Sequence, residues 1–200
     1  MKKLLAMFLM LCMIVPSMAL AQSEIKLDSA ERKKLNTFFS NFSEANLESF
    51  TQDTLTEQVL LDFALIHSYI NNFKSLIPSP DGATMGVPSA LVDKATERYF
   101  GRTLASHKEK TYSMPAADGE AYIFSQIGKL VGLGDNRFQA EGIIYSTGSG
   151  GTPDPHGTPE EWAKAGEEVD QMGTFSAVIK KVNSAGKDRY ILLEYTVEYE

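Results

Sequence analysis

Cysteine is almost absent from this sequence, and the only one, Cys12, lies within the first 21 residues. Leu11 precedes it where a lipoprotein signal has a small residue, so we do not expect a lipid anchor. If this segment is cleaved, the mature chain has no thiol, which excludes disulfides, thiolate nucleophiles and cysteine-bound metals. Histidine is also scarce, with three scattered residues, so the spacing of a zinc site is missing. We expect no metal and no cofactor.

Long apolar runs are absent as well, apart from one at 4–15 that follows two lysines. That run is too short to span a bilayer. A basic start, a short apolar run and the small residues Ala19 and Ala21 are typical of a cleaved signal peptide. We therefore predict a signal peptide at 1–21 and a single domain at 22–200. The protein would be periplasmic or secreted, without a transmembrane segment in the mature chain.

Basic residues are outnumbered by acidic ones. Removing the two lysines of the signal peptide from the 19 basic residues leaves 17 against 26 acidic residues, a net charge of −9. Nucleic acids and anionic membrane surfaces bind through basic patches. Neither is expected as a partner.

Two amphipathic helices are predicted in the first half of the chain. A capping box at 28–31 opens the first, which carries a phenylalanine-rich face. A second capping box at 54–57 opens the next, whose apolar stripe continues to Phe73. His67 lies at the edge of that stripe, and we interpret it as a core-edge side chain rather than a ligand.

A third helix is predicted at Ser89–Phe100, followed by Gly101, where a left-handed cap fits. Before it, residues 78–86 combine turn-forming residues with a lack of periodicity, which predicts a surface loop. After it, residues 102–110 are polar and predict a connection.

From Thr111 onward the apolar residues alternate with a period of two, which is typical of strands. The predicted strands cover residues 122–133, 137–146, 175–182 and 190–199. In the last of them, the odd-numbered positions from Ile191 to Tyr199, including Leu193, are apolar and predict the core face.

These patterns predict an α+β fold, in which two to three N-terminal helices pack on a curved antiparallel sheet of four to six strands. This arrangement is similar to the NTF2-like cone, an architecture that hosts both binding proteins and enzymes.

A long loop at 147–172 separates the two predicted hairpins. It contains a glycine-rich arm, the elbow Pro-Asp-Pro-His, and a short helix that Thr158 can cap and that carries the only tryptophan. The candidate ligand-binding residues in this loop are Asp154, His156, Glu160 and Trp162. A structural reading stands beside this one, in which the loop is a crossover, Trp162 covers the sheet and His156 holds a backbone carbonyl.

Catalytic templates do not fit the sequence. Gly148, Ser149 and Gly150 do not form a nucleophile elbow, because Thr147 stands where that motif requires glycine. No phosphate-binding or dinucleotide-binding glycine motif occurs. No catalytic residue can be assigned from motifs.

Four strings of the chain resemble a group of secreted or envelope-attached bacterial proteins to which no activity is assigned. They are ATERYFG (95–101), PAADGEAY (115–122), DPHGTPEEW (154–162) and RYILLEY (189–195). The resemblance covers nearly all of the mature chain and implies an envelope location. It implies no catalytic residue.

The sequence therefore favours an exported, non-catalytic protein that binds a small molecule or an envelope protein partner, with the 154–162 segment at the rim of a pocket. Two alternatives stay open. One is a small hydrolase or isomerase that uses His156 as a base with a nearby carboxylate. The other is a structural or regulatory interaction domain, which a large exposed apolar patch would favour.

Overall fold

The computed structural model describes residues 23–116, 122–148, 151–184 and 186–200. The predicted signal peptide and Cys12 lie outside these ranges, as do two residues of the glycine-rich arm, 149 and 150. Within the described ranges, no helix combines the length and the apolar character that crossing a bilayer requires.

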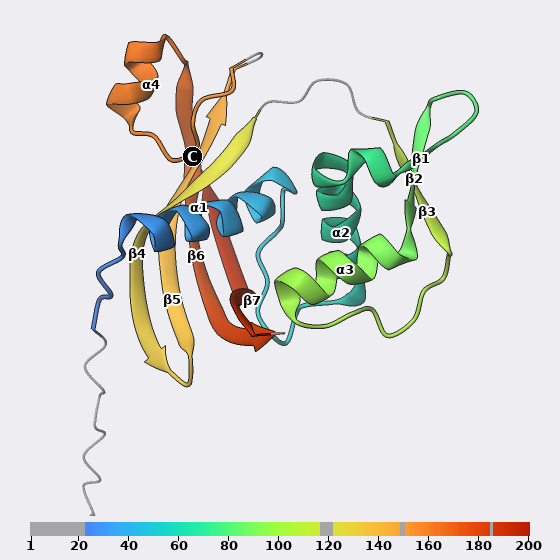
Figure 1. Ribbon diagram of the computed structural model, residues 1–200, viewed down its shortest axis with the longest axis horizontal. Helices are drawn as coiled ribbons and strands as arrows, with labels where there is room; N and C mark the ends of the chain where they lie inside the picture. Colours follow the sequence, from blue (N-terminus) through green and yellow to red (C-terminus); the bar gives the residue numbers. More distant parts are fainter. Residues whose placement is uncertain (1–22, 117–121, 149–150, 185) are drawn as a thin grey trace, which may run out of the picture.

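The larger part of the fold is a four-stranded antiparallel sheet with one helix, α1 (Ser29–Glu44), lying across it (Figure 1). Its strands are β4 (Ile123–Gly134), β5 (Arg137–Thr147), β6 (Val169–Ser184) and β7 (Lys187–Tyr199), and they neighbour one another in chain order. Two long hairpins therefore build this sheet. The predicted class, helices packed on a curved antiparallel sheet, is confirmed.

The start and the buried face of α1 follow from its sequence. The side chain of Asp28 caps the helix by accepting a hydrogen bond from the Glu31 amide at 2.7 Å. Phe38, Phe39 and Phe42 lie one helical turn or less apart and are at most 5% exposed. Each buried phenylalanine contributes about 1.5–3 kcal/mol to folding.

α1 also runs along the free edge of the sheet. The Asn36 side chain accepts a hydrogen bond from the Ile127 amide at 2.9 Å, and the Ser40 hydroxyl accepts one from the Ser125 amide at 3.0 Å. Arg32 donates to the Ile127 carbonyl at 2.7 Å. These side chains pair with backbone groups of β4 that would otherwise be left open at a sheet edge.

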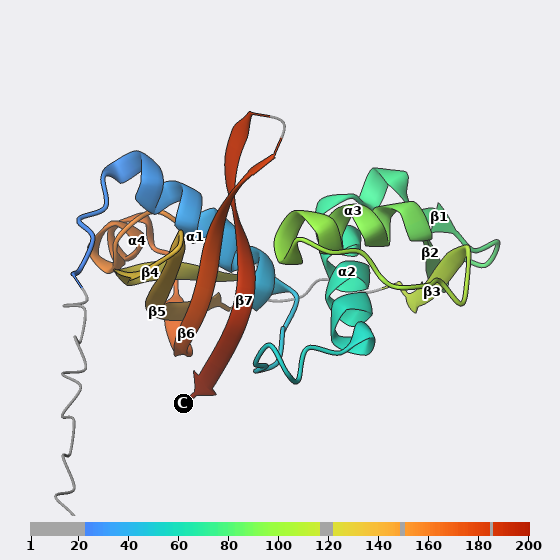
Figure 2. The same ribbon diagram turned by 90° about the horizontal axis from the view of Figure 1, so that it is seen from below.

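A second layer packs beside α1 and consists of two helices and three short strands (Figure 2). The helices are α2 (Glu57–Asn71) and α3 (Ser89–Phe100), and the strands are β1 (Ile77–Pro78), β2 (Thr84–Pro88) and β3 (Thr111–Pro115). A 3-10 turn, η1 (Phe73–Ser75), connects α2 to β1. The strands form an antiparallel sheet in the order β1-β2-β3.

The predictions for this layer had mixed outcomes. The α3 bounds and the left-handed conformation of Gly101, with a φ of 71°, are confirmed. The prediction of a surface loop at 78–86 is wrong, because β2 pairs with β3 and buries Met85 and Val87. β2 has only five residues and follows several turn-forming residues, so its alternation of buried and half-buried positions is too short to be recognised in the sequence.

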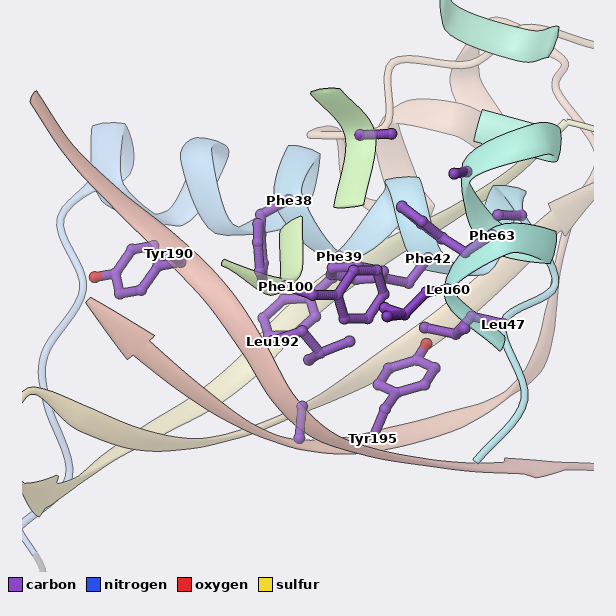
Figure 3. Close-up of a cluster of buried hydrophobic side chains, with 14 of the residues drawn as sticks. Phe38, Phe39, Phe42, Leu47, Leu60, Phe63, Phe100, Tyr190, Leu192 and Tyr195 are labelled. Atoms are coloured by element: carbon purple, nitrogen blue, oxygen red, sulfur yellow. The ribbon is translucent and has the colours of Figure 1, made fainter. Parts of the chain in front are cut away.

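The two layers share one aromatic core (Figure 3). The ring of Phe42 on α1 lies 5.4 Å from Phe63 of α2, 5.9 Å from Phe100 of α3 and 6.0 Å from Tyr195 of β7. These distances are typical of favourable ring contacts. α1 therefore holds the sheet on one side and the helix pair on the other.

The predicted core face of the last strand is only half right. Tyr195 is fully buried as expected, but the residues that reach the core before it are Tyr190 and Leu192. The pairing with β6 moves from Leu192 to Glu194 in one step, which leaves Leu193 as a bulge. An inserted residue reverses which alternate positions face inward, so Leu193 was assigned wrongly to the core face. Ile191 is buried, at 9% exposed, but it lies outside the main cluster.

Replacing Asn36 by alanine is expected to destabilise the protein by about 1–3 kcal/mol, because the buried Ile127 amide loses its acceptor. Urea unfolding measures this, and Lys33→Ala on the exposed side of the same helix is the control. Equal stability of Asn36→Ala and the control would show that the edge contact does not stabilise the fold.

Candidate functional site

The predicted short helix in the long loop is confirmed as α4 (Pro159–Ala165). Thr158 and Glu161 form a capping box, with the Thr158 amide donating to the Glu161 carboxylate at 2.8 Å and the Glu161 amide donating to the Thr158 hydroxyl at 3.3 Å. Pro159 occupies the first helical turn, and Gly166 ends the helix with a φ of 75°.

Trp162 on α4 is packed against the sheet. Its side chain is 4% exposed and lies edge-on to Phe124 and Tyr145, with ring centroids 5.4 and 5.1 Å away. The indole N–H donates to the Asp154 carbonyl at 2.8 Å. Phe124 points away from α1, because its neighbour Ser125 bonds to the α1 serines. Trp162 therefore ties the loop to the outer face of the sheet.

The other three candidates do not gather around one cavity with Trp162. Asp154 is exposed, and its carboxylate accepts a hydrogen bond from the His156 backbone amide at 2.9 Å. The Nδ1 atom of His156 is buried and has no hydrogen-bond partner within the described ranges. Glu160 is exposed on α4. Gln126 of β4 holds the elbow by donating to the carbonyls of Pro155 and Gly157 at 2.9 and 2.8 Å.

A pocket that none of these candidates lines is found where α1, α2 and α3 meet the elbow of the loop. Its volume is about 510 Å³, which is within the range of small-molecule sites. Of the loop residues that the structure describes, only Pro155 lines it. The residues that line it are Thr37, Ser40, Asn41 and Glu44 of α1, His67, Asn71 and Asn72 in and after α2, Leu91, Lys94, Ala95, Arg98 and Tyr99 of α3, and Tyr122 and Pro155.

Glu44 is the carboxyl group of this pocket. Burial raises its pKa from an ordinary 4.5 to about 7, although a hydrogen bond from the Asn71 side chain works in the opposite direction. Glu44 also lies in the last turn of α1, where no basic residue accompanies it. The C-terminal end of a helix disfavours negative charge. The carboxyl group is therefore ready to exchange a proton near neutral pH.

His67 faces the same space from α2 and is 7% exposed. Its ring stacks on Phe63 at 5.4 Å and meets Tyr99 edge-on at 4.8 Å. Burial, with a smaller contribution from Arg98, lowers its pKa to about 4, so the imidazole is neutral at pH 7. The side-chain nitrogen of Asn71 lies 3.1 Å from Nδ1 of this ring and also donates to the His67 carbonyl at 3.3 Å.

Two tyrosines and two cations complete the polar lining. Burial raises the pKa of Tyr99 and of Tyr122 above the ordinary value, so both phenols keep their protons at neutral pH. Lys94 and Arg98 lie four residues apart on α3 and therefore on one face of it. The Arg98 guanidinium lies 5.4 Å from the centroid of the Tyr99 ring.

Metal binding finds no support in the part of the chain that is described, since no three histidine, cysteine or acidic side chains cluster there. Among the described residues, the pocket lining offers neutral donors, two cations and one carboxyl group, whose pKa burial raises to about 7. Such a set can bind a polar molecule and exchange a proton with it.

The sequence patterns did not indicate this pocket, because apolar stripes reveal the core-facing side of a helix and not its polar side. Thr37, Ser40, Asn41 and Glu44 follow helical spacing on α1, as do Leu91, Lys94, Ala95 and Arg98 on α3. Glu44 carried a further signal, because an acid at a helix C-terminus without a nearby base breaks a local rule.

Comparisons with known proteins add no assignment. No protein-family model matches this chain, and searches of curated proteins and of solved structures found no match. The resemblance of the four sequence strings stays a prediction.

The raised pKa of Glu44 predicts a specific pH dependence of stability. The folded protein keeps this proton up to about pH 7, whereas an unfolded chain loses it near 4.5, so the stabilisation present below pH 4.5 is lost as the pH rises to 7. Glu44→Gln should therefore be more stable than the wild type at pH 8 by about 1–2 kcal/mol, a value reduced for partial solvent screening. At pH 4.5 the free energies of unfolding of Glu44→Gln and the wild type should be nearly equal.

Urea unfolding at the two pH values measures this difference. His67 titrates in both proteins, so its contribution cancels. The exposed Glu48→Gln variant is the matched control. The same stability difference for Glu44→Gln at pH 4.5 and pH 8 would contradict the raised pKa.

Trp162→Ala is expected to destabilise the protein by about 3–5 kcal/mol, because the buried indole leaves a cavity between α4 and the sheet. Trp162→Phe keeps one ring but loses the hydrogen bond to Asp154 and part of the buried indole volume, so its cost should be about 1–3 kcal/mol, below that of Trp162→Ala. Thermal unfolding followed by circular dichroism compares them. If Trp162→Ala unfolds at the same temperature as the wild type, the indole does not anchor the loop.

Proposed function

We propose that this protein is exported and binds a small polar molecule in the pocket between α1, α2 and α3. The proposal rests on one observation, which is a cavity of about 510 Å³ lined by converging polar groups on three helices. Export is supported by the signal-like pattern of residues 1–21.

The position of the pocket supports binding. Its walls belong to helices fixed by the shared aromatic core, so its shape is set before any ligand arrives. Its apolar lining comes from side chains such as Leu91, Ala95 and Tyr99, against which the body of a ligand can pack. Asn41, Asn71 and Tyr122 offer hydrogen bonds that fix its orientation.

An envelope protein is the second candidate for the bound partner. One observation favours it, since Ile70, Phe73 and Ile77 follow one another closely in sequence and are 43%, 53% and 54% exposed. Exposed apolar groups of this kind are used in protein contacts. They line no part of the pocket, so the two candidates can be tested separately.

Filling the pocket should abolish ligand binding. Ala95 is buried against the cavity, and Ala95→Phe places a ring inside it, whereas Ala90→Phe makes the same change on the exposed side of α3. A thermal-shift screen of small metabolites should find compounds that raise the melting temperature of the wild type and of Ala90→Phe. The same compounds should not affect Ala95→Phe.

The loop residues are tested in the same screen. Asp154→Ala and His156→Ala should keep most of the response, because neither side chain lines the cavity. If Ala95→Phe responds to every compound as the wild type does, the ligand does not occupy this pocket.

A further inference from the structure

Two cations in the pocket lack acidic partners. Neither Lys94 nor Arg98 forms an ion pair with any residue in the described parts of the chain, although the nearby Arg102 pairs with Glu57 at 3.1 Å. Many other lysines and arginines of the described chain also form no ion pair, but Lys94 and Arg98 are set apart because both line one pocket. Two adjacent, unpaired positive charges in a concave site attract anions.

The position of Arg98 is fixed from the sheet side. Arg189 of β7 donates to the backbone carbonyls of Glu97 and Arg98, and its guanidinium also pairs with the Glu97 carboxylate at 2.9 Å. The Glu97 carbonyl also accepts a hydrogen bond from the Gly101 amide at 3.1 Å, so the contacts of Arg189 add to the cap of α3. The Arg98 side chain itself stays available to the pocket.

A smaller hollow of about 210 Å³ adjoins the pocket along α1 and extends its positive lining. Both cavities share Thr37, Asn41, Arg98 and Tyr99, and the smaller one also contacts Lys34. Lys34 forms a long ion pair with Glu31, at 3.7 Å, and its ammonium lies 5.1 Å from the centroid of the Tyr190 ring. Arg98 therefore lies at the junction of two cavities that three cations line.

Glu44 faces these cations from α1, and its protonation decides the charge of the site. The groups around it are His67 from α2, Lys94, Arg98 and Tyr99 from α3, and Tyr122 before β4. His67 is neutral at pH 7, and the Glu44 pKa is about 7. A protonated Glu44 donates a hydrogen bond to an anion, whereas an ionised one repels it.

We infer that the pocket binds a small organic anion, with a carboxylate or phosphate group held by Lys94 and Arg98, and that Glu44 takes up a proton on binding. The inference rests on the proposed function, because it names the class of ligand for the same pocket. An aromatic or aliphatic body of the ligand packs on Tyr99 and Leu91. The affinity should fall about tenfold for each pH unit above 7, since one proton accompanies the anion.

The test uses a fragment panel of carboxylates and phosphate monoesters, each paired with its uncharged amide or alcohol. Thermal shift at constant ionic strength identifies binders, and titration calorimetry measures their Kd at pH 7 and pH 8. Repeating the titrations in two buffers of different ionisation enthalpy counts the protons taken up. The carboxylate and phosphate arms distinguish the two anionic groups.

The variants are Lys94→Gln, Arg98→Gln and Glu44→Gln, with the exposed and distant Lys187→Gln as the control. Anions should bind at least tenfold more tightly than their uncharged partners. Each pocket cation variant should weaken anion binding at least tenfold, and Lys187→Gln should not. Proton uptake should approach one in the wild type at pH 8 and vanish in Glu44→Gln, whose affinity should not depend on pH.

Several results would overturn the inference. If uncharged partners bind as tightly as the anions and Ala95→Phe abolishes their binding, the ligand class is wrong and the proposed function stands. Anion binding that neither Lys94→Gln nor Arg98→Gln weakens, or that takes up no proton, also overturns it. If no compound of either kind binds, the inference and the proposed function fail together.

Discussion

The pairing of α1 with the open edge of β4 is the contact on which the rest of this structure depends. Asn36 and Ser40 satisfy backbone amides of the edge strand, so the helix lies in one register along the sheet. That register presents Phe38, Phe39 and Phe42 to the shared core and leaves Thr37, Asn41 and Glu44 toward α2 and α3. The same helix therefore builds the core with one face and the pocket with another.

Much of the fold could be predicted from the sequence, because strong local signals agree with the final packing. The side chains of Asp28 and Thr158 cap the starts of α1 and α4, and Gly101 marks the end of α3. The predictions that failed concern features that depend on residues distant in the chain. The pairing of β2 with β3 turns a segment rich in turn residues into a strand. The bulge at Leu193 is set by the register against β6, which no periodicity within β7 reveals.

The pocket was harder to predict than the fold. The loop carrying Trp162 has an unusual composition, but the structure uses the indole as an anchor on the sheet. The residues that converge belong to three ordinary helices, and their shared cavity appears only once α2 and α3 pack against α1. Glu44 is the one pocket residue with a local signal in the sequence, because a negative charge at the C-terminal end of a helix is disfavoured by the helix dipole.

The central claim is that packing of α1 against the second layer buries Glu44 enough to bring its proton exchange to neutral pH. A carbon-13 NMR titration of the Glu44 carboxyl carbon in the ligand-free protein, assigned by comparison with Glu44→Gln, tests this most directly. A midpoint near pH 7 is predicted. A midpoint near the ordinary value of 4.5 would contradict the account.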